Sequence, residues 1–355
     1  MTRPLTGGHS ALHHPFPQPP APGQVIEVAP GILWTRLAMP FRLDHINIYL
    51  LADGDGWTVL DTGLGDAATI AAWEALVRGP LCGMRLSRLI VTHMHPDHIG
   101  MAGWLCRRFG MTLWTSMTTW LGCLNVSLGP GELDAPHFRE FYLRHGLDQA
   151  TTNSVTTQGH RYLKMVTPLP PTFRRLVAGD RIHIGPRQFD VMTGDGHAPE
   201  QLMLHCAAEG LFFASDQVLA KITPNVSVWT VEPEGNPLGL YLRSLRELQE
   251  TIAPEVLVLP GHQLPFVGLH RRAQDLIAHH ATRCDMILAA VAEAPRTLAS
   301  LVPVIFPRLM DPHQLGFAFS ETHAHVNLLV EEGALRWQDT GTGVMTVSRG
   351  NGNLR

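Results

Sequence analysis

Cysteine is scarce in this chain of 355 residues. Its five cysteines, at positions 82, 106, 123, 206 and 284, are scattered and form no C-x-x-C pair. That pattern excludes a thioredoxin-like redox motif and a cysteine-rich zinc module. An odd number of unclustered cysteines is typical of reduced, mostly buried thiols. We therefore expect a cytoplasmic protein.

Charge and long apolar runs are also sparse. Only 16% of the residues are charged, and the formal net charge of -4 argues against a general binder of nucleic acid or membrane surfaces. No apolar run approaches the roughly 18 residues that a membrane span needs. Apolar residues nevertheless make up 45% of the chain, enough for a sizeable core. The length favours one large domain plus a small one.

Two further absences concern the start of the chain and the catalytic nucleophile. Residues 1–22 lack the apolar core of a signal peptide and are rich in proline, glycine and histidine, so we expect a disordered tail. The chain contains no G-x-S-x-G motif and no Cys–His pattern that would indicate a nucleophilic side chain.

One stretch is rich in potential metal ligands. Residues 93–98 read H-x-H-x-D-H and directly follow Leu89-Ile90-Val91, a short branched run typical of a buried strand. From Asp97 to Phe109 the apolar residues recur with a loosely helical period. The motif is therefore predicted to lie on a strand-to-helix turn, with its imidazoles where the strand ends.

A catalytic zinc usually keeps three protein ligands and an open position, so this motif requires partners elsewhere. Three candidates follow strand-like apolar runs later in the chain: His197, Asp216 and His262. Taken singly, each is a weak signal, because a lone histidine after a strand more often has an ordinary structural role. Together with the first motif they complete two sets of three ligands. One further carboxylate is left over to bridge the two sets.

These residues resemble the pattern of the metallo-β-lactamase superfamily, over about residues 23 to 268. The resemblance implies that His93, His95 and His197 hold one zinc ion and that Asp97, His98 and His262 hold a second. It makes Asp216 the bridging ligand and Asp61 a supporting group near the metals. Two zinc ions are the expected cofactors, with manganese or iron as alternatives.

The order of predicted strands and helices favours an α/β fold. A hairpin over residues 46–60 precedes a helix from Asp66 to Arg78, and a run of hairpin strands follows from Arg181. We expect the four-layer αβ/βα sandwich of this superfamily, with two sheets face to face and helices outside. The catalytic domain should span residues 23–268.

Residues 116–180 break this rhythm and are predicted to be an insertion that caps the metal site. Between His137 and Arg187 there are eight basic residues against three acidic ones. A solvated surface with a chance excess of charge is one interpretation. The other is a basic rim that attracts an anionic substrate; its candidate residues are Arg161, Lys164, Arg174 and Arg175.

Residues 269–355 are predicted to form three helices and a β-hairpin, a small winged-helix-like domain. Its third helix carries Glu321, Glu331 and Glu332 and no lysine or arginine, so it would repel DNA. We expect it to pack against the catalytic domain or a second subunit, which leaves a homodimer possible. His323 and His325 are expected in ordinary helix positions rather than facing the metals.

The resemblance implies a binuclear hydrolase in which a metal-bridging hydroxide attacks the substrate and Asp97 carries a proton to the leaving group. True β-lactamases of the superfamily lack the aspartate at Asp216, and oxygen-reducing relatives carry a carboxylate where this chain has His95. We favour an ester or thioester of an anionic small molecule, resembling an acyl-CoA or glutathione thioester. The alternatives are an endoribonuclease or other phosphodiesterase, which would make nucleic acid the partner, a lactonase, and a non-enzymatic binding protein.

Overall fold

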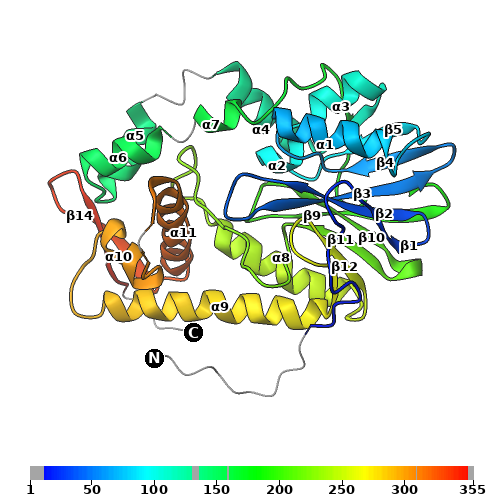
Figure 1. The fold of residues 1–355 in the computed structure, drawn as a ribbon. Coiled ribbons are helices and arrows are strands. Elements are labelled where there is room, and N and C mark those ends of the chain that lie inside the picture. Colours follow the sequence, from blue (N-terminus) through cyan, green and yellow to red (C-terminus); the bar gives the residue numbers. More distant parts are fainter. Residues whose placement is uncertain (1–11, 130–135, 158–159, 309, 351–355) are drawn as a thin grey trace.

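A computed structural model describes residues 12–129, 136–157, 160–308 and 310–350 of the chain. Two β-sheets lie face to face (Figure 1). In spatial order the first sheet consists of β1 (Ile26–Ala29), β2 (Ile32–Ala38), β3 (His45–Asp53), β4 (Gly56–Leu60), β5 (Leu86–Ile90), β6 (Thr112–Thr115) and β7 (Arg174–Arg175). The second consists of β13 (Phe266–Val267), β12 (Leu257–Pro260), β11 (Leu211–Ser215), β10 (Gln201–Cys206), β9 (Arg187–Gly194) and β8 (Arg181–Ile184).

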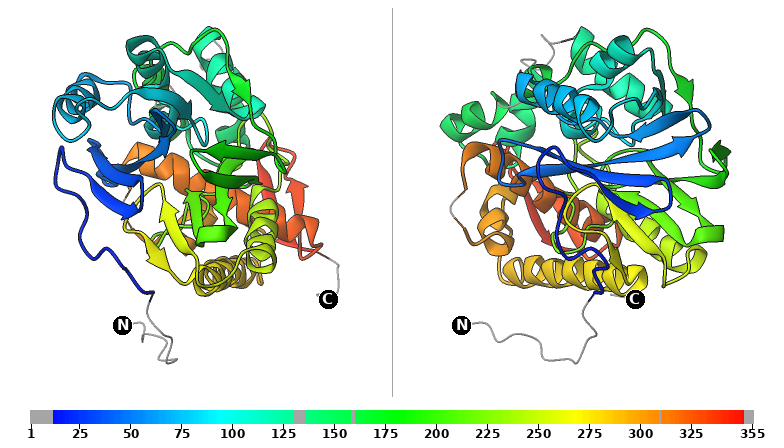
Figure 2. Two further views of the ribbon diagram at one scale, coloured as in Figure 1. Left: turned by 90° about the vertical axis from the view of Figure 1, so that its right-hand side faces the viewer. Right: turned by 45° about the vertical axis from the view of Figure 1, so that its right-hand side comes forward.

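Helices cover the outer face of each sheet. On the first sheet these are α1 (Ala67–Arg78) and α3 (Ala102–Phe109), and on the second α8 (Pro237–Thr251) and α9 (Leu269–Ala290) (Figure 2). Side chains of both sheets, including Trp34, Tyr49 and Phe213, fill the space between them. The four-layer α/β sandwich predicted from the sequence is therefore confirmed.

The helix predicted from Asp97 to Phe109 is in fact two helices, α2 (Pro96–Ile99) and α3. The break lies at Gly100 and Met101, and Gly100 packs so closely that a Cβ atom there would lie only 2.5 Å from the carbonyl oxygen of Met165. The next amide, of Met101, leaves the helix pattern and donates to the Thr62 hydroxyl at 3.0 Å. By contrast, the predicted cap of α1 is confirmed, since Asp66 accepts a hydrogen bond from the amide of Thr69 at 2.7 Å.

The prediction of a disordered tail over residues 1–22 is wrong for the part of it that the structure describes. His13 pairs with Val267 as a β-bridge, and its amide donates to the Val267 carbonyl at 3.3 Å. Phe16 packs edge-to-face on Trp34, with ring centres 6.5 Å apart. These apolar contacts order a segment whose composition alone indicates disorder; residues 1–11 lie outside the described residues.

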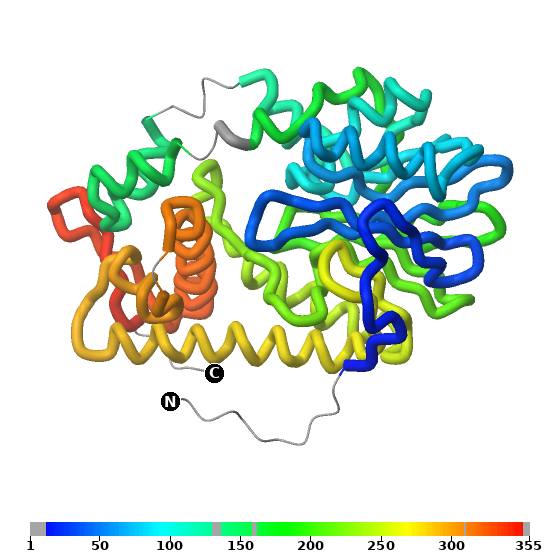
Figure 3. Tube along the Cα trace, in the orientation of Figure 1, coloured from blue at the N-terminus to red at the C-terminus, as the bar shows by residue number. Residues whose placement is uncertain are grey.

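The described residues of the insertion at 116–180 include four helices. They are α4 (Met117–Leu128), α5 (Pro136–Arg144), α6 (Gln149–Thr156) and α7 (His160–Leu163). α4 lies beside the H-x-H-x-D-H loop, because a Cβ atom on its Gly122 would lie 2.5 Å from the sulfur of Met94. At the other end, α6 reaches the C-terminal segment, where Val155 lies against Gly316 (Figure 3). The insertion thus connects the metal-binding loop with the C-terminal helices.

The C-terminal segment contains α9, α10 (Leu298–Ile305), α11 (Pro312–Glu331) and a hairpin of β14 (Leu335–Asp339) and β15 (Met345–Arg349). Its buried residues, such as Phe319 and Leu329, belong to the same hydrophobic core as Phe212 and Val258 of the second sheet. This part of the chain therefore packs on the catalytic layers, one of the two uses predicted for it. Its winged-helix assignment stays a prediction.

No helix in the described ranges combines the length and the apolar character needed to cross a bilayer.

Candidate metal centre

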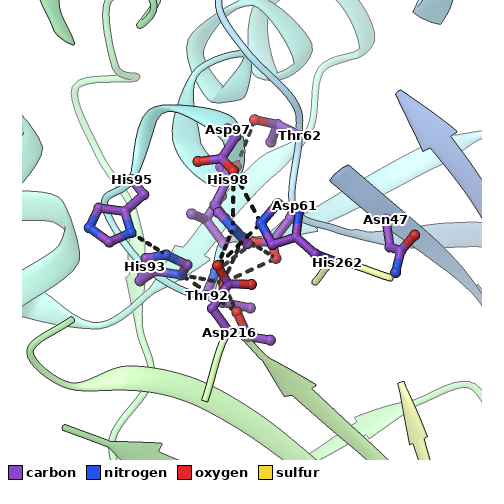
Figure 4. Close-up of polar contacts among 12 residues, drawn as sticks. Asn47, Asp61, Thr62, Thr92, His93, His95, Asp97, His98, Asp216 and His262 are labelled. Atoms are coloured by element: carbon purple, nitrogen blue, oxygen red, sulfur yellow. Dashed lines mark hydrogen bonds and ion pairs between the residues drawn. The ribbon is translucent and has the colours of Figure 1, made fainter. Parts of the chain in front are cut away.

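The predicted ligands converge at one edge of the sandwich. His93 lies just beyond the end of β5, Asp216 directly follows β11, and His262 lies just beyond β12. β4, β5 and β6 are parallel to one another, as are β11 and β12. Parallel strands end at the same side of a sheet, which brings residues far apart in sequence together (Figure 4).

The first set of ligands is His93, His95 and His197. Their ligand nitrogens all lie within 4.8 Å of one another. Nε2 of His93 and Nδ1 of His95 are 2.9 Å apart and point at each other. The ring of His197 stands edge-on to that of His95, with centres 4.6 Å apart. This is the set that the resemblance assigns to one zinc ion.

The second set is Asp97, His98 and His262, which also lie within 4.8 Å of one another. Oδ2 of Asp97 is 3.3 Å from Nε2 of His262 and 3.7 Å from Nε2 of His98. Asp97 is the most exposed of the three, with 18% of its side chain accessible, whereas the two histidines are almost fully enclosed.

Asp216 lies between the two sets. Its Oδ2 atom is 3.5 Å from Nε2 of His197, 3.5 Å from Nε2 of His98 and 3.2 Å from Nε2 of His262. One carboxylate oxygen thus faces a histidine of the first set and two of the second, as a bridging ligand requires.

Hydrogen bonds on the far side of each ring aim the ligand nitrogens inward. Nδ1 of His197 contacts the carbonyl of Asn225 at 2.8 Å, and Nδ1 of His262 contacts the carbonyl of His45 at 2.7 Å. Bonds of this kind set the tautomer and orientation of metal-binding imidazoles. Nε2 of both rings is thereby directed inward, where it could bind a metal ion.

Asp61 supports the centre without belonging to either set of three. Its carboxylate contacts Nδ1 of His98 at 2.9 Å and accepts from the amide and hydroxyl of Thr92 at 2.8 and 3.0 Å. Asp61 lies at φ +63°, a left-handed conformation that aspartate tolerates better than most residues. The turn after β4 thus places a carboxylate beneath the H-x-H-x-D-H loop.

The electrostatics of the centre favour added positive charge. Burial, reinforced by neighbouring histidines, holds the pKa of His93 well below its ordinary value, so this ring is neutral. Burial also works to lower the pKa of His262, but the carboxylates of Asp216 and Asp97 raise it to about 10. The same carboxylates outweigh burial at His98 and raise its pKa. The negative charge of the carboxylates is thus balanced by protons on imidazoles. Divalent cations could replace those protons.

The residues fit a pair of metal ions. Nε2 of His98, Nε2 of His197 and Oδ1 of Asp216 are buried and have no hydrogen-bond partner. Buried polar atoms are rarely left unpaired, so a missing partner needs an explanation. Neutral imidazoles and carboxylates with no thiolate form a donor set typical of hydrolytic zinc, manganese or iron sites.

Several residues that hold the ligands in place were missed at the sequence level. Asn47 donates to the carbonyls of Pro260 and Gln263, both at 2.9 Å, and so secures the turn that carries His262. Its signal was present: a polar side chain between Ile46 and Ile48 in an otherwise apolar strand. Thr92 and Ser215 carried no comparable signal.

The four predicted rim residues are placed differently from one another. Arg174 lies on β7 with its guanidinium carbon 4.3 Å from the ring centre of Trp114, and Arg175 is exposed beside it. Lys164 is exposed just after α7, in a segment where the Tyr162 hydroxyl donates to the carbonyl of Met94 at 2.8 Å. Arg161 belongs to α7, but its side chain lies outside the described part of the structure. The rim stays a prediction.

Comparison with known proteins decides the family. Residues 42–262 match the sequence pattern of the Metallo-beta-lactamase superfamily, and residues 284–349 match that of the Metallo-beta-lactamase-like, C-terminal domain. The chain belongs to the metallo-β-lactamase superfamily. Proteins of this superfamily are typically zinc-dependent, and the chain is accordingly a metal-dependent hydrolase by family.

Two solved structures of superfamily members are similar over nearly the whole chain. A Beta-lactamase domain protein from Burkholderia ambifaria is 40% identical, with 95% of this chain and 98% of that chain covered and a TM-score of 0.89. A metallo-beta-lactamase family protein from Thermus thermophilus is 28% identical, with coverage of 91% and 99% and a TM-score of 0.76.

Among curated relatives, a Hydroxyacylglutathione hydrolase from Cereibacter sphaeroides (strain ATCC 17025 / ATH 2.4.3) is 24% identical over 231 residues. The match covers 63% of this chain and 68% of the relative.

Proposed function

We propose that this superfamily member hydrolyses an ester or thioester bond in a small anionic molecule, with two zinc ions as cofactors. The observation that carries the proposal is the position of Asp216, whose Oδ2 atom faces histidines of both ligand sets. The similarity to a hydroxyacylglutathione hydrolase supports a thioester as the substrate class.

Two bound zinc ions would supply a water of lowered pKa as nucleophile and would polarise the carbonyl under attack. The chain itself determines where they sit. Asp216 would be shared by both ions, and three further residues would hold each ion. The rigid contacts of Asp61 and the backbone carbonyls keep the imidazoles aimed inward.

Asp97 is suited to move a proton. It is the most accessible carboxylate of the centre, and its Oδ2 atom lies near His262. Burial works to raise the pKa of Asp97, but the neighbouring His98 and His262 outweigh burial and hold the pKa below its ordinary value. The group is therefore an anion at neutral pH, able to accept a proton from the attacking water and pass it to the departing thiolate or alkoxide.

The segment around Lys164 borders the metal-binding loop. Besides the Tyr162 contact with Met94, the amide of Gly65 donates to the carbonyl of Met165 at 2.7 Å, and the amide of Thr167 donates to that of Gly100 at 2.7 Å. Lys164 is exposed within this stretch, so it is the rim residue that we propose as a contact for an anionic substrate.

The test is a substrate panel with metal-reloaded protein. Purified protein is stripped, reloaded with zinc, manganese or iron, and assayed with an acyl-CoA series, a glutathione thioester, a p-nitrophenyl ester, a lactone and a labelled RNA oligomer. We expect turnover of thioester or ester. Turnover of RNA without thioester or ester would overturn the proposal in favour of a nuclease, and turnover of lactone alone would make it a lactonase.

Asp216→Asn tests the role of the shared carboxylate on the substrate that is turned over. The amide keeps the shape but loses the charge, so activity should be abolished. Asp190→Asn, on the partly exposed face of β9, is the matched control and should retain activity. If no substrate is turned over with any metal, the non-enzymatic alternative replaces the proposal.

A further inference from the structure

A second group of metal-binding side chains lies in the C-terminal helices. It consists of His280 on α9 and of Glu321 and His325 on α11, and the ligand atoms of all three lie within 4.8 Å of one another. The three residues are 0%, 6% and 0% exposed. Glu321 and His325 are four residues apart, so they share one face of α11, opposite His280.

The two histidines face each other as two ligands of one ion would. Nδ1 of His280 is 3.1 Å from Nε2 of His325. The corresponding distance between His93 and His95, at the family's metal centre, is 2.9 Å. In both pairs the two imidazole nitrogens lie within hydrogen-bond distance of each other, close enough for one ion to bind both.

The outer nitrogen of His325 repeats a second feature of the family's centre. Nδ1 of His325 contacts the backbone carbonyl of Glu321 at 2.7 Å, as Nδ1 of His262 contacts that of His45 at 2.7 Å. A proton on that nitrogen leaves Nε2 of His325 as a lone pair directed at His280.

The imidazole rings of His280 and His325 are both fully buried. Burial, with the nearby charge of other histidines, lowers the pKa of His280 to about 2, and burial lowers that of His325 to about 4. Both rings are therefore neutral at neutral pH, with lone pairs available to a cation.

Arg283 completes the arrangement without blocking it. Its Nη1 atom donates to Oε1 of Glu321, and the carboxylate still offers an oxygen within 4.8 Å of both imidazole ligand nitrogens. Ligating carboxylates are commonly held by a further hydrogen bond of this kind. The guanidinium of Arg283 also rests on the ring of Phe306, 4.4 Å from its centre, so it is positioned independently of Glu321.

We propose that His280, Glu321 and His325 bind one divalent transition-metal ion, Zn²⁺ in the first instance, at a structural site separate from the Asp216 centre. Two imidazoles and a carboxylate are suitable ligands for such an ion. The ion would join α9 to α11, across 45 residues of sequence, and so stabilise the C-terminal segment against the catalytic layers. This inference does not depend on the proposed substrate.

The test counts metal ions. Wild type, His280→Gln and Glu321→Gln are stripped with a chelator, dialysed against Zn²⁺ or Co²⁺, and measured for metal per chain by mass spectrometry. We expect both variants to hold one equivalent less than wild type and to lose one component of the Co²⁺ absorption spectrum. His279→Gln, the same change at the neighbouring half-buried position on α9, is the matched control and should hold as much as wild type. Equal metal content in wild type and both variants would overturn the proposal.

Two further measurements keep the result decisive. Glu321→Gln preserves side-chain shape and a contact to Arg283, so it serves alone if His280→Gln does not fold. A His93→Ala, His262→Ala, Asp216→Asn triple variant, which lacks one histidine from each set and the shared carboxylate, should still bind one equivalent of Zn²⁺. If that folded triple variant binds none, the C-terminal site is refuted whatever the enzyme's substrate proves to be.

Discussion

The hydroxyl of Ser215 donates a hydrogen bond to the hydroxyl of Thr92, with the two oxygen atoms 2.8 Å apart. Ser215 ends β11 in the second sheet, and Thr92 follows β5 in the first. This contact therefore joins the two sheets at the edge where the metal ligands converge. Thr92 also touches Nδ1 of His93 and the carboxylate of Asp61, both at 3.0 Å.

Thr92→Val should weaken metal binding. The change keeps the shape of the side chain but removes the hydroxyl that contacts His93 and Asp61, and losses of this kind typically cost about 10–100-fold in metal affinity. Chelator competition measures the effect. Thr35→Val is the control, since Thr35 is equally buried and its hydroxyl donates to the carbonyl of Gln24 at 2.8 Å, far along the chain from any ligand. Equal affinities in the two variants would contradict the role given to Thr92.

Asp61→Asn should reduce affinity mainly for the ion held by His98. Asparagine accepts the left-handed backbone of this position, so the variant removes charge without straining the turn. His98 then loses the carboxylate that contacts its Nδ1 atom at 2.9 Å. We expect a loss of about 10–100-fold, seen as one weakened step in a zinc titration. Retention of both steps at wild-type affinity would show that the Asp61 charge is unimportant.

Gly261→Ala should displace the shared carboxylate. A Cβ atom at this position would lie 2.3 Å from Oδ1 of Asp216 and 3.0 Å from Cε1 of His98, closer than side chains can approach. Activity and metal content should both fall, while circular dichroism still shows a folded protein. Gly235→Ala is the control, because the three atoms nearest its Cβ atom would all belong to Glu232, at 3.0–3.1 Å, and none to the metal centre. Unchanged activity in Gly261→Ala would show that Asp216 can move without harm.

His323→Phe should make the protein less sensitive to acid. Burial, together with the nearby His145, holds the pKa of His323 well below its ordinary value of 6.5. A histidine with a lowered pKa takes up its proton more readily in the unfolded chain. Its contribution to stability is therefore complete above pH 6.5 and declines as the pH falls below that value.

Phenylalanine removes the titrating group and can still pack between Phe141 and Trp337. Urea unfolding at about pH 7.5 and about pH 5 should show a smaller drop in unfolding free energy for the variant than for wild type. The same substitution at exposed His183 should leave the drop unchanged. An equal drop in all three proteins would contradict the prediction.

Lys164→Glu should raise KM for an anionic substrate and leave KM for a neutral ester unchanged. The exposed ammonium group stands in the segment that borders the metal-binding loop, and reversing its charge would repel an anion. The effect should shrink at high salt because the charge is exposed. Arg85→Glu, in the exposed ion pair with Asp55 near the turn between β3 and β4, is the matched control. If Lys164→Glu leaves KM for the anionic substrate unchanged, or changes KM equally for the anionic and the neutral substrate, Lys164 does not contact the substrate.

Arg174 shows that the sequence alone could not tell which basic residues face a substrate. Composition placed it in one basic group with Lys164, whereas the structure sets its guanidinium on the ring of Trp114. Arg88 covers the same ring, with its guanidinium carbon 4.4 Å from the centre. Charge counts do not distinguish a cation that packs on an aromatic ring from one that faces a ligand.

The sequence by itself determined the layers of the fold and predicted the ligand residues. Short apolar strands, capped helices and the H-x-H-x-D-H motif are local signals, because neighbouring residues alone produce them. They also pointed to His197, Asp216 and His262, since each follows a strand. The broken helix at Gly100 and the ordered segment around Phe16 escaped this reasoning, because both depend on contacts with distant parts of the chain.

Only the tertiary structure decided how these residues meet. It aligned the ends of β5, β11 and β12, set Oδ2 of Asp216 among three imidazoles, and brought His280 opposite Glu321 and His325. The physical reason is that a ligand set is defined by distances of a few ångströms between side chains that lie far apart in the sequence. Those distances arise from sheet pairing and core packing, which no local pattern encodes.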